Sequence, residues 1–335
     1  MPSVIRGLHG KNDRLLLRQY GLARVEPATL ELHRLLAAIV RTQPHQQPGL
    51  SILVVRLLHA AVPDAPWNNP AAWPAWRQLL PHVLTATGLH RTLMGVERDV
   101  AWLLHRAAEY LDTRGEPTTA RPLFEHALEL RRSMLGDEHP DTLASASSLS
   151  LTLHQLGQYG PARQLAEDTL TRCRRVLGEG HPDTLRSAIY LTVALVGVGR
   201  YEPARQLAED TLTRCRRVLG EDHPDTLLSA TALAATLREV GQCEEARQLG
   251  EDTLTRCRRV LGEDHPYTLL SATTLAATLR ELRQCEQARQ LAEDTLTRCR
   301  RVLGEDHPDT LLAARSLAAV LANLGEHDQI RGLDG

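Results

Sequence analysis

The second half of the chain alternates apolar and polar positions with the period of a helix. From Ala204 to Leu219, small and apolar residues recur at steps of three and four, and most positions between them are charged. This spacing places the apolar side chains on one face of an α-helix. Gly220 follows, and glycine commonly ends a helix because it adopts a left-handed conformation without steric cost. The pattern predicts an amphipathic helix over 204–219, with an apolar stripe of Leu207, Ala208, Thr211, Leu212, Cys215, Val218 and Leu219.

A second helix is predicted after a short loop. Pro224 fits the first turn of a helix, where its missing N–H loses no hydrogen bond, and the helix dipole stabilises Asp225 beside it. The helix should run to about Glu239, with Gly241 after its end. Its predicted buried side consists of Leu227, Ala230, Leu233, Ala234 and Leu237.

These two helices form one unit of a repeat. The dipeptide His-Pro occurs five times, from His139 to His307, each copy 42 residues after the last. Residues 205–228 recur unchanged as 289–312. One helix pair cannot cover its own apolar stripe, so neighbouring pairs must stack on one another. The sequence therefore predicts an all-α fold, an α-solenoid of stacked antiparallel helix pairs.

The unit resembles the tetratricopeptide repeat, specifically its kinesin-light-chain type. The LGxxHP junction of that family is matched at Leu219-Gly220 and His223-Pro224. The resemblance covers 97–325 and implies five complete helix pairs and a sixth first helix, followed by a polar tail over 326–335. No capping helix is evident after the sixth first helix. The sequence leaves open whether Leu317, Val320 and Leu321 are exposed at this uncapped C-terminal end and whether the end drives self-association.

The first 96 residues lack the repeat. Residues 13–41 resemble the end of the winged-helix segment in bacterial signal-transduction ATPases of the STAND (NB-ARC-like) type. The resemblance implies a wing hairpin formed by 23–25 and 30–32, flanked by helices over 15–20 and 33–41. It divides this part into a winged-helix-like remnant over 1–45 and a helical connector over 46–96, with a helix at 73–84. Residues 7–12 lack the GxxxxGK[ST] spacing of a P-loop, so the ATPase itself is not expected here.

Composition argues against several classes of partner. With 39 basic and 41 acidic residues the net charge is -2, and aromatic residues make up only 3% of the chain. Neither nucleic acid nor a membrane is therefore expected as a partner. The best apolar stretch, 50–62, is interrupted by Arg56 and His59 and falls short of the roughly 20 residues that cross a bilayer. The start of the chain has no signal-peptide pattern, and we expect a cytoplasmic protein.

Cysteine and histidine are spread along the repeats and do not cluster. Zinc needs ligands at about 2.0–2.3 Å from one ion, and cysteines that lie one per repeat cannot share it. We therefore interpret Cys173, Cys215, Cys257 and Cys299 as packing residues, and expect no metal and no cofactor. No GxSxG motif or other activated nucleophile is present, so no catalytic residue and no enzyme activity are expected.

The tetratricopeptide resemblance implies a concave groove lined by the first helices. An extended peptide in such a groove can pair its carboxylates with arginines and bury its apolar side chains. Each charged residue also has a simpler interpretation, as a group that keeps the surface soluble. The family's groove positions give these candidate partner-binding residues: Trp102, His105, Arg186, Tyr190, Arg238, Glu239, Arg280, Glu281 and Arg315.

Two functions follow as hypotheses. The first is a non-catalytic scaffold that binds a protein or peptide in the groove of the solenoid. The alternative is the sensor and regulatory arm of a STAND ATPase, split from or lacking its nucleotide-binding domain. Both hypotheses use the groove for binding. They differ in whether the solenoid acts alone or as part of a STAND ATPase.

Overall fold

The computed structural model describes residues 23–26, 29–32, 48–63, 66, 69–88 and 94–326. Apart from one hairpin, the regular structure of these residues is helical, as the hydrophobic pattern predicts. The hairpin pairs β1 (Ala23–Glu26) with β2 (Thr29–Leu32) in antiparallel register, with Glu26 opposite Thr29. The described chain forms two compact units, which are Met1–Thr113 with Thr118–Ser145, and Arg114–Pro117 with Ala146–Gly335.

The first unit is built around buried tryptophans of its early helices. Trp76 is fully buried, donates its indole N–H to the carbonyl of Pro63 at 3.1 Å, and stacks on Tyr110 with ring centroids 5.6 Å apart. Trp73 donates in the same way to Pro66 at 3.0 Å. These contacts tie α4 to α5 and to the segment that follows α3. The helical segments of the unit are α3 (Pro48–Ala61), η2 (Pro70–Ala72), α4 (Trp73–Ala86), α5 (Glu97–Thr113), α6 (Pro117–Leu135) and the start of α7 (Pro140–Gln155).

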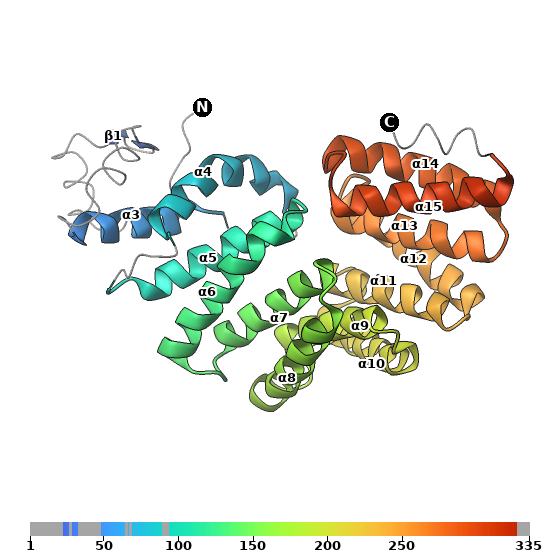
Figure 1. Cartoon of the computed structure of the whole chain (residues 1–335), viewed down its shortest axis with the longest axis horizontal. Coiled ribbons are helices and arrows are strands. Elements are labelled where there is room, and N and C mark those ends of the chain that lie inside the picture. The colour runs from blue at the N-terminus through green and yellow to red at the C-terminus, as the bar shows by residue number, and fades with distance from the viewer. Residues whose placement is uncertain are drawn as a thin grey trace. The chain divides into compact units, whose positions relative to one another are not determined.

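The second unit is a stack of antiparallel helix hairpins, which follow one another from green to red in Figure 1. First and second helices alternate along the chain, with first helices starting at the His-Pro junctions. After the end of α7, the unit contains α8 (Tyr159–Leu177), α9 (Pro182–Gly197), α10 (Tyr201–Leu219), α11 (Pro224–Glu239), α12 (Cys243–Leu261), α13 (Pro266–Glu281), α14 (Cys285–Val302) and α15 (Pro308–Leu324).

Packing in this unit makes the first helices a continuous layer. Each second helix from α10 to α14 contacts the first helices on either side of it, and α9, α11, α13 and α15 also contact one another directly in sequence. The core lies between the two layers, where Ala208 and Leu212 of α10 meet Leu233 and Leu237 of α11. The predicted buried side of α11 is confirmed, since all five of its residues are buried.

The His-Pro junction has a defined structural role. The Nδ1 atom of His223 accepts a hydrogen bond from the backbone N–H of Asp225 at 3.1 Å, so the imidazole caps the first turn of α11. Pro224 occupies the first helical position, as predicted. The other four junctions form the same bond at 3.1–3.2 Å. The repeated histidines are therefore helix caps.

At the apolar positions, one prediction is wrong and one open question is answered. Val218 is 45% exposed, because it lies in the last turn of α10 and faces away from the neighbouring first helices. Leu317, Val320 and Leu321 are buried, and Val320 belongs to a core cluster with residues of α12, α13 and α14. The large apolar side chain of α15 most exposed to solvent is Leu311, at 52%. Self-association through the three predicted residues is therefore not supported.

The N-terminal predictions have a mixed outcome. The hairpin lies where the wing was expected, and α4 covers the predicted helix at 73–84. The expected helices over 15–20 and 33–41 lie outside the described residues, so the winged-helix assignment and the boundaries at 45 and 96 stay predictions. None of the described helices combines the length and the hydropathy that crossing a bilayer requires.

Candidate functional site

The layer of first helices in the second unit carries a half-buried ion pair between repeats. Arg186 of α9 donates through Nη2 to Oδ2 of Asp225 on α11 at 3.0 Å. The Asp225 side chain is 1% exposed, whereas that of Asp183, its equivalent one repeat earlier, is 33% exposed. Burial disfavours the guanidinium charge, but the Asp225 carboxylate outweighs this and raises the pKa of Arg186, with help from Tyr190 and Tyr267. The Arg186-Asp225 ion pair thus joins α9 to α11.

Comparison of the repeats with one another shows that this cluster is specific to one place. The positions 42 residues from Arg186 are Ala144 and Leu228, and neither is charged. Tyr267 likewise replaces the aspartate that follows Pro in the other four junctions. Arg186, Tyr190 and Tyr267 are thus departures from a nearly uniform repeat. They meet around an aspartate that the repeat supplies at every junction but one.

The other predicted charged residues lie near the C-terminal ends of first helices. Arg238 pairs with its neighbour Glu239 on α11, and Arg280 pairs with Glu281 on α13. All four side chains are partly exposed, so their charges remain available to a ligand. Arg315 of α15 is exposed and lies on a different first helix from these pairs. The structure therefore gives two equivalent Arg-Glu pairs one repeat apart, and a separate Arg315.

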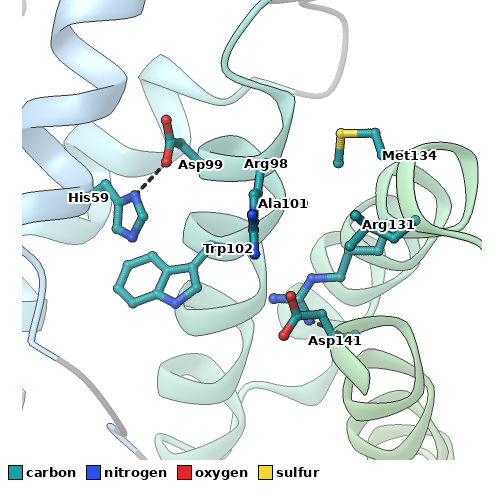
Figure 2. Close-up of a pocket in the computed structure, with 9 residues that line it drawn as sticks. His59, Arg98, Asp99, Ala101, Trp102, Arg131, Met134 and Asp141 are labelled. Carbon is teal, nitrogen blue, oxygen red and sulfur yellow. Dashed lines mark hydrogen bonds and ion pairs between the residues drawn. The ribbon is translucent and has the colours of Figure 1, made fainter. Parts of the chain in front are cut away.

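A cavity of about 490 Å³ lies in the first unit. Figure 2 shows His59 extending from α3 and Arg131 from α6 toward the space beside Trp102 of α5. The ring centroids of His59 and Trp102 lie 4.2 Å apart, and the Nδ1 atom of His59 is 2.6 Å from the carboxylate of Asp99. The cavity is lined by His59, Arg98, Asp99, Ala101, Trp102, Arg131, Met134, Leu135 and Asp141.

His105 lies behind this cavity and is buried. Its Nε2 is 3.3 Å from Glu109, and its Nδ1 is 3.3 Å from the hydroxyl of Ser145 on α7. Burial lowers the pKa of His105, which favours the neutral ring. Burial opposes ionisation of Glu109, but His105 and the Arg106 guanidinium at 2.7 Å lower the pKa of this carboxyl to about 2. His105, predicted as a groove residue, is thus a buried part of the helix packing.

The cysteines agree with their interpretation as packing residues. Cys173, Cys215, Cys257 and Cys299 are buried, and burial raises the pKa of each thiol, to about 11 for Cys173 and about 12 for the others. A high pKa keeps a thiol protonated and unreactive at neutral pH. Within the residues that the structure describes, no group of histidine, cysteine and carboxylate side chains could hold a metal ion.

Sequence reasoning missed several of the residues that the structure brings together. His59, Asp99 and Arg131 come from helices whose sequences give no chemical motif, and they meet only through packing. Nothing in the sequence gives a reason to select Asp225, because it occurs in a tripeptide that recurs along the chain. Comparing each repeat with the next would have identified Arg131 and Arg186, since both place a charge where other repeats have cysteine, alanine or leucine.

Stacked helix hairpins with a continuous layer of first helices define the chain as an α-solenoid repeat protein. The model of the tetratricopeptide repeat matches residues 99–175, 199–257, 228–301 and 270–333, which together exceed half of the chain. The chain belongs to the tetratricopeptide repeat family.

Solved structures share this architecture. The TPR-like repeats of a kinesin light chain from Podosopora anserina are 26% identical, with a TM-score of 0.49 over 62% of this chain and 98% of that one. A Rap protein complexed with Competence and Sporulation Factor is 12% identical, with a TM-score of 0.52 over 94% and 85%. A STAND protein with a tetratricopeptide repeat sensor from Pyrococcus horikoshii is 14% identical, with a TM-score of 0.45 over 93% and 55%. No curated protein matches the sequence.

Proposed function

We propose that this chain is a non-catalytic cytoplasmic scaffold that binds a protein or peptide on the layer of first helices in its second unit. The observation that supports this most directly is the continuity of that layer from α9 to α15. Neighbouring first helices contact one another, and each second helix from α10 to α14 packs against the two first helices beside it. We take the side of the layer that faces away from the second helices to be the concave groove of the solenoid.

The charges on the layer suit an extended peptide. The Arg238-Glu239 and Arg280-Glu281 pairs lie one repeat apart and are partly exposed. A peptide carboxylate can replace the neighbouring glutamate as the partner of either arginine, and such charge-assisted bonds are directional. The Arg186 and Tyr190 side chains, both half-buried, add residue types that often dominate binding energy at interfaces. The Rap protein, which shares the fold, is itself complexed with a factor.

The proposal is tested by reversing charge on this layer. We expect the double variant Arg238→Glu and Arg280→Glu to lose the partner that wild-type protein captures, while its helical circular dichroism is unchanged. The matched control is Arg216→Glu with Arg258→Glu. These two arginines lie on second helices one repeat apart, and their side chains are exposed to a similar extent. Equal loss of capture in both double variants, or in neither, would place the binding surface elsewhere.

The STAND alternative rests on the N-terminal resemblance. Its predicted helices lie outside the described residues, and no observation in the second unit favours it over a free-standing scaffold. It stays a prediction, and an ATPase gene directly next to this one would support it.

A further inference from the structure

Arg131 is a buried cation without a direct anionic partner. Its side chain extends from α6 and the residue is 5% exposed. Its Nη1 donates to the carbonyl oxygen of Asp141 at 2.8 Å and to the hydroxyl of Ser145 at 2.7 Å. Both acceptors are uncharged, and among the described residues no carboxylate forms an ion pair with this guanidinium. Buried charges in proteins are normally paired, because removing an ion from water is costly.

The charges around Arg131 act on it only from a distance. Burial lowers the pKa of Arg131, the Asp141 and Glu109 carboxylates oppose this, and the Arg106 guanidinium adds to it. Glu109 is already bound by His105 and Arg106. An arginine stays protonated at neutral pH even when burial lowers its pKa. The guanidinium of Arg131 is therefore a positive charge in the first unit that the surrounding groups neutralise only in part.

Helix packing does not require this charge. The residue 42 positions after Arg131 is Cys173, and the same step leads to Cys215, Cys257 and Cys299. All four cysteines are buried in the corresponding place of later second helices. A small thiol thus fills this site in four repeats, and the first repeat alone introduces a guanidinium. Arg131 is also one of the residues that line the cavity.

The remaining walls combine an apolar surface with few free charges. Trp102, Met134 and Leu135 supply the apolar part, and Arg98 adds an exposed guanidinium on α5 (Figure 2). The Asp99 carboxylate already contacts His59. The Asp141 carboxylate also lines the cavity and opposes the binding of an anion. Of the charged groups that are not already paired within the cavity, two are cationic, Arg98 and Arg131, and one is anionic, Asp141.

We propose that this cavity binds a small apolar monocarboxylate, with the carboxylate on Arg131 and the apolar body against Trp102, Met134 and Leu135. The volume of about 490 Å³ lies within the range of roughly 300–1,000 Å³ that small-molecule sites occupy. A carboxylate matches the planar fork of a guanidinium and supplies the missing negative charge. The site lies wholly in the first unit, so it is independent of the proposed peptide surface.

Titration of the wild-type chain with two matched probes tests the inference. The probes are 3-phenylpropionate and its uncharged amide, followed by calorimetry and by tryptophan fluorescence. We expect the acid to bind at least about tenfold more tightly than the amide, a difference of about 1.4 kcal/mol. Equal affinities, or no binding of the acid at millimolar concentration, would overturn the proposal.

A variant identifies the group responsible. Arg131→Cys installs the residue that later repeats carry here, and we expect it to abolish the preference for the acid while helicity is retained. Arg132→Cys is the control, because Arg132 is the next residue on the same helix and its side chain is 46% exposed. A preference that survives in Arg131→Cys would refute the assignment. If that variant does not fold, the comparison of acid and amide on the wild-type chain still decides the question.

Discussion

Arg283 shows how one residue departs from an otherwise uniform turn. Gly157, Gly199 and Gly241 occupy the equivalent turn of earlier repeats with φ of 72°, 73° and 83°. Arg283 takes their place with φ of 60°, and within the described residues no other non-glycine residue has positive φ. The left-handed region is strained for a residue with a Cβ atom. The hairpin of α13 and α14 therefore folds in spite of its turn residue.

We expect Arg283→Gly to stabilise the protein by about 1 kcal/mol, since glycine adopts this conformation without strain. Urea denaturation followed by circular dichroism measures the change. The reciprocal substitution Gly241→Arg is the matched control and should destabilise by a similar amount. Failure of the two variants to shift in opposite directions would show that the turn is not strained.

His154 predicts a dependence of stability on pH. Its ring contacts Tyr159, with centroids 5.1 Å apart, and its Nδ1 is buried without a hydrogen-bond partner. Burial lowers the pKa of His154, so the folded state favours the neutral ring. The unfolded chain binds a proton near the ordinary histidine pKa of about 6.5, and the folded chain does so only at lower pH. Stability should therefore fall as the pH drops below about 6.5.

Urea denaturation at pH 7.5 and pH 5.5 measures this effect. His154→Gln removes the titrating ring and should lose less stability between the two pH values than wild type does. All other histidines are common to both proteins, so the difference between them reports on His154. Identical losses in wild type and variant would contradict the prediction.

At the scale of elements, an aspartate in the loop before a first helix forms ion pairs with the second helix that follows, in the α12 and α14 repeats. Asp222 contacts Arg256 at 3.3 Å and Arg259 at 2.6 Å. One repeat later, Asp264 contacts Arg298 at 3.2 Å and Arg301 at 2.5 Å. Gly180 occupies the equivalent loop position one repeat earlier, so it supplies no carboxylate there. The series of ion pairs is thus incomplete at one junction.

Gly180→Asp should complete the series by pairing with Arg214 and Arg217. A side chain fits, since a Cβ atom at this position would lie 3.5 Å from the nearest atom of Val218. We expect about 0.2–1 kcal/mol of stabilisation relative to Gly180→Ala, which is the range for exposed ion pairs. The alanine variant controls for the lost flexibility of glycine in the unfolded chain. Equal unfolding free energies for the two variants would show that the added pair contributes nothing.

At the scale of the whole molecule, the periodic part of the sequence predicted most of the fold. The 42-residue step, the His-Pro junctions and the apolar stripe gave the helix pairs and the core of α11 almost without error. Burial at the array end was left open, because the stripe does not show which neighbouring helices cover α15. The buried state of His105 was missed for a related reason, since its partner Ser145 lies 40 residues away.

The candidate sites were predictable only in part. Family positions identified Trp102, Arg186 and the Arg-Glu pairs, but not what each one contacts. The cavity beside Trp102 depends on how α3, α5 and α6 pack, and α3 lies outside the repeat. Residues without a period can be placed only by the folded chain. The departures from the repeat, Arg131 above all, were visible in the sequence and became informative once their surroundings were known.

The ion pairs between successive repeats have a consequence for cooperativity. They link one hairpin to the next, whereas the apolar core also holds each hairpin together internally. Dissolved ions screen exposed charges, with a Debye length of about 8 Å at physiological ionic strength and about 3 Å at 1 M. Concentrated salt should therefore weaken the coupling between neighbouring hairpins more than the hairpins themselves. An array that unfolds cooperatively in dilute buffer would then unfold hairpin by hairpin from its ends at high salt concentration.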